Sequence, residues 1–214
     1  MTEDEARAWL MAQFDVSRET WERLERYVAI LLSAMDEQNL IAESTRPHIW
    51  ARHIADSAQL LLHTKSAGEG EWLDLGSGAG LPGIVVACLS ERPLMMVESR
   101  RKRIDFLESV ITELGLAHAR VFGGRVEMAP PTRAAVISAR AYAPLPKLLE
   151  SALHLSDKNS LWVLPKGRNA QNELETARPT WQGVFHVEPS LTDADSAIIV
   201  AHAVAPVAKR KGRG

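Results

Sequence analysis

The chain has 214 residues, of which 46% are hydrophobic and 24% are charged, a composition typical of a folded globular protein. Its apolar runs fall far short of the roughly 18 to 20 residues that a membrane span needs. The acidic start MTEDEARAWL lacks the basic and apolar parts of a secretion signal. Cys88 is the only cysteine, which excludes an internal disulfide. We therefore expect a cytoplasmic protein.

Charge is divided unevenly along the chain. Residues 1–71 hold 7 Lys and Arg against 13 Asp and Glu, whereas residues 72–214 hold 18 against 14. The two parts therefore carry net charges of −6 and +4, and the chain ends in the basic run Lys209-Arg210-Lys211-Gly212-Arg213. Such a tail is compatible with nucleic-acid binding and equally with a solvated end of the chain.

The first 65 residues show the apolar spacing of helices, and Ser17 stands where an N-cap is expected. Helices are predicted near residues 3–14, 18–38 and 46–63. A break at Ser66 to Gly70 then marks a boundary. We expect a helical extension, a sheet-containing unit and a basic tail, over residues 1–65, 66–207 and 208–214.

From Trp72 onward, short apolar runs alternate with amphipathic stretches. Strands are predicted over 71–75, 94–98, 119–122, 134–138, 160–164, 183–188 and 196–204. Helices are predicted near 82–90, 101–114, 145–155 and 169–177. This alternation predicts an α/β fold with a mostly parallel, seven-stranded sheet covered on both faces. Only a turn signal, Pro189 to Asp195, separates the last two strands, so we expect them to pair antiparallel.

A glycine-rich turn, DLGSGAGLPG, follows the first predicted strand. A phosphate-binding P-loop needs a lysine directly after its last glycine, and none follows Gly83. The dinucleotide pattern G-x-G-x-x-G occurs at Gly78, Gly80 and Gly83, but this pattern alone is weak. A bare turn, a dinucleotide site and another nucleoside site therefore remain open at this point.

Asp74 disfavours the dinucleotide, because a carboxylate facing the ligand would repel a diphosphate and attract a cationic amino acid. The nested pattern D-x-G-x-G-x-G, at Asp74, Gly76, Gly78 and Gly80, is the first motif of Rossmann-like methyltransferases that use S-adenosylmethionine. Glycines let the backbone approach such a ligand closely. Glu98 ends the next predicted strand, where a carboxylate can hydrogen-bond ribose hydroxyls.

Several further segments accompany the glycine loop: Asn39-Leu40, the run Arg52 to Ser57, Glu98-Ser99, Lys102-Arg103, Phe106-Leu107, Gly124 to Glu127, Ser138 to Ala141, and Lys166-Gly167. Together they resemble the RsmG (GidB) family, bacterial enzymes that methylate guanine N7 in small-subunit (16S) ribosomal RNA. The resemblance implies a Rossmann-like class I methyltransferase that uses S-adenosylmethionine. It also implies cofactor contacts at Gly76, Leu81, Val126, Glu127 and Arg140, with Glu98 where the family often has Asp.

Arg140 ends the fourth predicted strand, where it could bind the carboxylate of the cofactor or reach an RNA phosphate. His53 and Asp56 lie three residues apart on one face of a predicted helix. They either face the site or fasten the helices to the sheet, and we favour the second interpretation. They are too few for a metal site, so no metal is expected.

Guanine N7 carries an exposed lone pair, so its methylation needs no deprotonation. We therefore single out no catalytic residue and expect a direct displacement that depends on alignment. RNA would be held by basic side chains, and Tyr142 is a candidate for stacking on a base or for packing. The predicted RNA contacts are Arg100, Arg103, Arg125, Arg140, Lys166 and Arg168.

Alternative functions remain open from the residues alone. A methyltransferase acting on another RNA, a small molecule or a protein would use the same loop. A nicotinamide-dependent oxidoreductase is disfavoured, because Tyr142 and Lys147 are five residues apart rather than four. A cofactor-binding module without catalysis has no degraded motif to support it. The expected partner is 16S ribosomal RNA or the small ribosomal subunit, and a monomer is the default.

Overall fold

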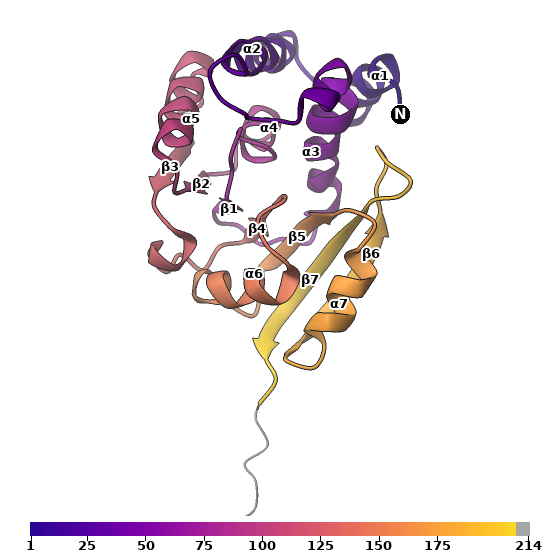
Figure 1. Ribbon diagram of the computed structural model, residues 1–214, viewed down its shortest axis with the longest axis vertical. Coiled ribbons are helices and arrows are strands. Elements are labelled where there is room, and N and C mark those ends of the chain that lie inside the picture. Colours follow the sequence, from indigo (N-terminus) through magenta and orange to yellow (C-terminus); the bar gives the residue numbers. More distant parts are fainter. Residues whose placement is uncertain (209–214) are drawn as a thin grey trace, which may run out of the picture.

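Seven strands form one sheet in the order β3-β2-β1-β4-β5-β7-β6 (Figure 1). This computed structural model describes residues 1–208. The strands are β1 Trp72–Leu75, β2 Leu94–Glu98, β3 Ala119–Gly123, β4 Val136–Ser138, β5 Leu161–Lys166, β6 Trp181–Pro189 and β7 Ala197–Pro206. Strands β1 to β5 pair in parallel, and β7 runs antiparallel to β5 and β6. The predicted sheet and its antiparallel final pair are therefore confirmed, while the predicted tail from residue 209 lies outside the described residues.

Helices cover both faces of the sheet (Figure 1). One face carries α1 Glu3–Phe14, α2 Arg18–Ala34, α3 Asp56–Ala58, α4 Gly83–Leu89 and α5 Arg101–Leu114, and the other carries α6 Leu145–Ala152 and α7 Ala170–Ala177. Successive strand residues feed the two cores alternately, since side chains on a strand alternate in direction. Trp72 belongs to the first core and Leu73 to the second. Burial on both faces explains the unbroken apolar runs of the central strands.

The N-terminal helices share the first core with the sheet. Ser17 caps α2 as expected, because its hydroxyl accepts the backbone N–H of Thr20 at 3.2 Å. Further along α2, the buried Tyr27 hydroxyl donates to the carbonyl of Ala79 in the glycine loop at 2.7 Å. The packing of α2 is thereby coupled to the loop that the sequence singles out as a ligand site.

The segment before β1 departs from the prediction of one regular helix over residues 46–63. It contains 3₁₀ turns at Glu43–His48 and Gln59–His63, a π-helical turn at Trp50–Ala55, and α3. Pro47 lacks a backbone N–H, so it cannot extend a hydrogen-bonded helix. The N–H groups of Trp50 and Ala51 donate instead to the Glu3 carboxylate of α1, at 3.0 and 2.9 Å. Within residues 1–208, no helix is both long and apolar enough to cross a membrane.

Replacing Tyr27 with Phe is expected to lower the free energy of unfolding by about 1 to 2 kcal/mol. The reason is that the Ala79 carbonyl would lose its donor inside a packed core. Urea denaturation measures this loss. Thr112→Val is the matched control, because the Thr112 hydroxyl donates to the carbonyl of Glu108 at an exposed site. This control should change stability by less than about 0.5 kcal/mol, and an equal loss in both variants would contradict the coupling.

Candidate active site

The glycine loop leaves β1 at the point where the strand order reverses, between β2 and β4. Open α/β sheets bind their ligands beyond the carboxyl ends of the strands at such a point. Gly76 and Gly78 have φ of +66° and +58°, a left-handed conformation that favours glycine. A Cβ built on Gly76 would lie 2.6 Å from Cδ2 of Tyr142. Any side chain there would collide with this ring, so the loop requires glycine at this position.

Glu98, at the end of β2, holds the glycine loop from the side. Its Oε2 accepts the backbone N–H of Gly78 at 3.0 Å, and its Oε1 accepts those of Ser99 and Arg100 at 2.7 and 2.9 Å. The residue is only 5% exposed, yet it lines a cavity. Arg103 places Nη1 3.9 Å from Oε2, the oxygen that accepts only one backbone N–H. That oxygen retains capacity for a hydroxyl donor from a ligand.

Asp74 faces the protein interior, so the expectation that its carboxylate faces the ligand is wrong. It is fully buried beneath the loop. Its Oδ2 accepts the backbone N–H of Gly83 at 3.2 Å, and its Oδ1 accepts the Ser138 hydroxyl at 2.8 Å. Burial raises the pKa of the Asp74 carboxyl, while these hydrogen bonds oppose that rise. Asp74, on β1, is therefore bonded both to β4, through Ser138, and to the start of α4, through Gly83.

A cavity of about 350 Å³ opens beside Glu98, within the size range of small-ligand pockets. Among the predicted cofactor contacts, it is lined by Gly76, Glu98, Val126 and Glu127. Leu81 is buried in the first core instead, because the turn into α4 directs it away from the carboxyl edge. Gly80 belongs to the same turn and accepts the N–H of Ile84 at 2.7 Å. The structure thus places Leu81 and Gly80 behind the cavity rather than in it.

A second cavity, of about 500 Å³, lies beyond the ends of β4 and β5. The segment Ala141 to Ala143 lines both cavities and so forms their common wall. Ala141 has a φ of +52°, a strained conformation for a residue with a Cβ and one that often occurs at functional sites. Tyr142 packs its ring on Gly76, and its hydroxyl donates to Oγ of Ser151 at 3.3 Å. The Tyr142 ring is therefore both a packing residue and a wall of the two cavities.

Arg140 lines the second cavity rather than the first. Its guanidinium donates to Nδ1 of His53 at 3.0 Å and lies 3.4 Å from Oδ2 of Asp56. His53 and Asp56 both contact Arg140, so they join the N-terminal segment to β4, in agreement with the interpretation that they fasten it to the sheet. Desolvation, together with the charges of Arg140 and Arg52, lowers the pKa of His53 to about 3.

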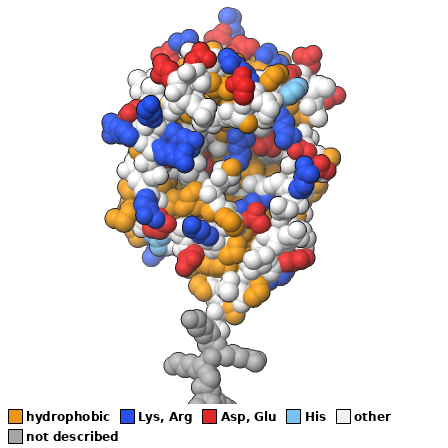
Figure 2. Space-filling model, in the orientation of Figure 1, with side chains coloured by type: hydrophobic (Ala, Val, Ile, Leu, Met, Phe, Trp, Pro, Cys, Tyr) orange, Lys and Arg blue, Asp and Glu red, His pale blue; other side chains and the backbone are white. Residues whose placement is uncertain are grey.

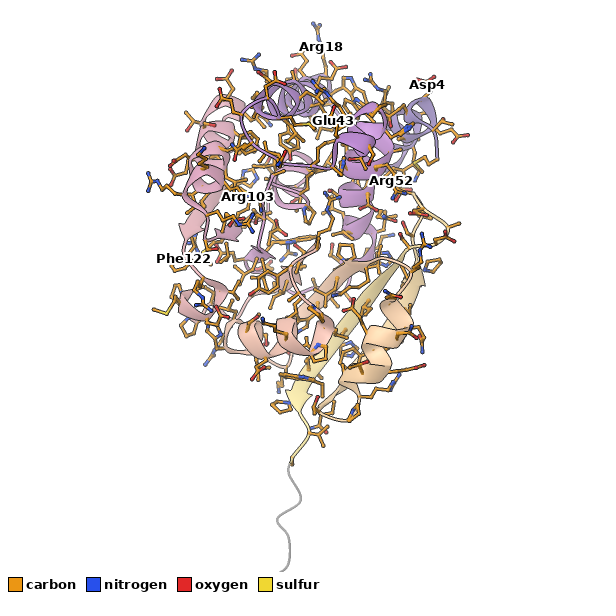
Figure 3. All side chains as sticks on the ribbon, viewed as in Figure 1. Asp4, Arg18, Glu43, Arg52, Arg103 and Phe122 are labelled. Carbon is orange, nitrogen blue, oxygen red and sulfur yellow. The ribbon has the colours of Figure 1, made fainter. Side chains whose placement is uncertain are left out.

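Besides Arg140, four of the predicted RNA contacts lie at or near the surface around the cavities. Arg100, Arg103 and Arg125 line the rim of the first cavity, and Arg168 is exposed after β5. Figure 2 shows Lys and Arg side chains spread over this face, with acidic ones between them. In Figure 3, which shows the same face, Arg103 lies at the left of the view and Arg52 at the right.

Lys166 is less exposed than these arginines and is held by partners within the protein. Its side chain is only 9% exposed, and its ammonium donates to the Ala143 carbonyl at 3.0 Å and to Glu173 at 2.8 Å. Lys166 nevertheless lines the second cavity, where it holds the common wall against α7. Its contact with RNA stays a prediction.

Part of the site could not be found from the sequence. Thr192 donates to Oδ1 of Asp56 at 2.8 Å, and Asp193 pairs with Arg52 at 2.6 Å. Both residues lie in the turn between β6 and β7, more than 130 positions from their partners along the chain. A turn of Asp, Thr and Ser residues carries no local signal of such contacts. Only the antiparallel return of β7 beside β5 brings the turn to this edge.

Comparisons with known proteins agree with this geometry. The model of the family rRNA small subunit methyltransferase G matches residues 20–196. Ribosomal RNA small subunit methyltransferase G of Sphingopyxis alaskensis is 52% identical over 209 residues, covering 97% of this chain and 89% of that protein. The protein of the same name from Rhizorhabdus wittichii is 52% identical over 216 residues, covering 100% of this chain and 99% of its own.

Solved structures share the fold at low sequence identity. A mutant of MtNAS in complex with S-adenosylmethionine has a TM-score of 0.57 at 14% identity, covering 85% of this chain and 74% of its own. A SAM dependent methyltransferase from Aquifex aeolicus has a TM-score of 0.56 at 12% identity, covering 74% and 93%. The fold is therefore that of the Rossmann-like class I methyltransferases. Within this class, the chain belongs to the rRNA small subunit methyltransferase G family, which confirms the resemblance to RsmG (GidB).

His53 gives folding a defined pH dependence. The pKa of His53 is about 3 in the folded chain, against an ordinary value of 6.5. Below pH 6.5, His53 is therefore protonated in the unfolded chain while it stays neutral in the folded chain. Its contribution to stability is complete above pH 6.5 and is lost as the pH falls. Between pH 7.5 and 5.5, this residue should lower the free energy of unfolding by about 1.4 kcal/mol.

Urea denaturation of the wild type and of His53→Asn at the two pH values measures this contribution. The variant should lose less stability on acidification, although His63, whose pKa burial also lowers, contributes in the same direction in both proteins. Equal losses in wild type and variant would show that His53 is protonated in the folded protein.

Proposed function

We propose that this protein transfers a methyl group from S-adenosylmethionine to N7 of a guanosine in small-subunit (16S) ribosomal RNA. The observation that carries the proposal is the pair of cavities at the carboxyl edge of the sheet, which share the wall Ala141 to Ala143. One cavity is framed by the glycine loop and Glu98, as a nucleoside requires. Membership of the rRNA small subunit methyltransferase G family supports ribosomal RNA as the substrate.

The first cavity fits the cofactor on three counts. Oε2 of Glu98 has acceptor capacity for a ribose hydroxyl, and Gly76 lines the cavity while its missing Cβ leaves room for the Tyr142 ring that forms the wall. Val126 and Glu127 line the same cavity beyond β3, where they would hold the adenine. Gly78 acts indirectly through its N–H to Glu98, as Asp74 does from beneath the loop. When bound, S-adenosylmethionine supplies a methyl group activated by its sulfonium.

The second cavity would receive the guanine. Its N7 lone pair is available without removal of a proton, so the protein has to align the acceptor rather than activate it. Tyr142 offers an aromatic surface on the common wall, and Arg140 offers a cation beside it. Neither residue needs to accept a proton in this reaction. The absence of an essential general base stays a prediction.

The rest of the RNA would be bound by charge. Arg100, Arg103 and Arg125 stand at the rim of the first cavity, and Arg168 is exposed beyond β5. Each phosphate that these residues neutralise should steepen the salt dependence of RNA binding. Oligomerisation is not needed to complete either cavity, so we propose that a single chain acts on the ribosomal RNA or on the small subunit.

A methyl-transfer assay tests the function. Purified protein is incubated with S-adenosylmethionine and with small-subunit RNA or subunits from cells that lack this enzyme. The RNA is then digested, and its nucleosides are identified by mass spectrometry. We expect 7-methylguanosine to appear. Glu98→Gln should lower the rate at least about tenfold, because its amide cannot accept at all the positions that the carboxylate fills.

Glu91→Gln is the matched control, since the Glu91 side chain is 92% exposed. It should leave the rate unchanged. If the protein methylates a different nucleoside, or a small molecule and not RNA, the proposed acceptor is wrong and the proposed cofactor site still stands. A protein that transfers no methyl group to any of these acceptors would overturn the proposal.

A further inference from the structure

Arg140 leaves the end of β4 and is held by one short segment of the N-terminal region. Its Nη1 lies 3.4 Å from the carbonyl of Arg52 and 3.4 Å from Oδ2 of Asp56, and its Nη2 lies 3.0 Å from Nδ1 of His53. The shortest of these contacts is the one to histidine. The orientation of the guanidinium therefore depends most on His53.

The protons of this contact can be assigned without ambiguity. Arginine has only donors and stays protonated, so Nδ1 of His53 must be the acceptor. The proton of His53 is then on Nε2, which lies 2.7 Å from Oγ1 of Thr45. The Thr45 hydroxyl in turn donates to the carbonyl of Ala42 at 2.7 Å. One continuous series of hydrogen bonds thus runs from Nη2 of Arg140 through His53 and Thr45 to the carbonyl of Ala42, and it requires a neutral His53.

The neutral His53 orients the guanidinium of Arg140 and brings no negative charge to it. Among the described residues, Asp56 is the carboxylate that pairs with Arg140, and its Oδ1 also accepts Gln59 and Thr192, both at 2.8 Å. The neighbouring cation Arg52 pairs with Asp193, and Lys166, which also lines the second cavity, pairs with Glu173. Within residues 1–208, the Nε–H and the second Nη2–H of Arg140 have no acceptor. When Nη2 donates to His53 through the hydrogen on its Nη1 side, the two free groups form the guanidinium edge that binds a planar oxyanion with two parallel hydrogen bonds.

We propose that His53 is a positioning residue, which holds the guanidinium of Arg140 so that its free edge clamps an oxyanion in the second cavity. This inference rests on the proposed function. The oxyanion is a phosphate of the acceptor RNA or the carboxylate of the cofactor, which share this chemistry. Arg140 lines the second cavity and not the first, and this placement favours the phosphate. His53 itself touches neither ligand and acts through Arg140.

Two nearly isosteric variants test the proposal. In His53→Asn, the side-chain oxygen lies near the position of Nδ1 and can accept from Arg140. In His53→Gln, the oxygen lies near the position of Nε2, so it can reach Thr45 but not Arg140. His118→Ala is the matched control, because His118 is a part-buried histidine bonded to the carbonyl of Ala87, remote from both cavities. Circular dichroism and thermal unfolding establish that each variant is folded.

Affinity for small-subunit RNA, affinity for S-adenosylhomocysteine, and kcat and KM for methyl transfer are measured for each protein. We expect His53→Gln to weaken one affinity by roughly tenfold or more, because a misplaced Arg140 would lose one charge-assisted hydrogen bond to the oxyanion. His53→Asn should restore most of it, and His118→Ala should match the wild type. A loss in RNA affinity or KM identifies the phosphate as the clamped group. A loss in S-adenosylhomocysteine affinity identifies the carboxylate.

Wild-type affinities in His53→Gln, or equal losses in the Asn and Gln variants, would overturn the positioning role. This outcome is read from binding and so does not depend on turnover. Failure of the proposed function would appear separately, as absence of methyl transfer by the wild type. Between pH 6 and 8, kcat/KM should show no ionisation that His53→Asn removes, because His53 stays neutral beside Arg140, Arg52, Asp56 and Asp193.

Discussion

Backbone N–H groups crowd the turn where the chain leaves β1 and enters α4, and water does not reach most of them. Two buried carboxylates accept these groups: Asp74 from beneath, through Gly83, and Glu98 from the side, through Gly78. A buried donor without an acceptor would cost roughly 1 to 3 kcal/mol, so the loop conformation depends on both carboxylates. The same two residues join β1 to β4 and β2 to α5. The cavity beside Glu98 is therefore built by the protein before any ligand arrives.

The N-terminal helices extend this construction. Tyr27 reaches the loop from above, and the segment that contains His53 and Asp56 reaches β4 through Arg140. The turn between β6 and β7 closes the same edge through Thr192 and Asp193. Residues from three distant parts of the chain thus meet around the second cavity. The segments before β1 thus help to hold the carboxyl edge of the sheet, where the candidate site lies.

The sequence predicted the features whose signals are local. Alternating apolar runs predicted the strands, and the glycine spacing with Glu98 predicted a ligand site at the switch point, where the structure has a cavity. The orientation of Asp74 was missed, because spacing along a strand does not reveal that Ser138 and Gly83 take up both carboxylate oxygens. The ion pair of Lys166 with Glu173 was missed for a similar reason, since Glu173 lies on the following helix. The prediction of one regular helix over residues 46–63 was wrong, because the N–H groups of Trp50 and Ala51 donate to the Glu3 carboxylate and not to backbone carbonyls of the same helix.

Preorganisation of the glycine loop is the central claim, and amide hydrogen exchange of the ligand-free protein by NMR tests it most directly. The account predicts that the N–H groups of Gly78, Gly83 and Arg100 exchange slowly without ligand, because the carboxylates of Glu98 and Asp74 accept them. Addition of S-adenosylhomocysteine should then change their protection little. Fast exchange in the free protein, with protection gained only on binding, would show that the ligand rather than the protein orders the loop.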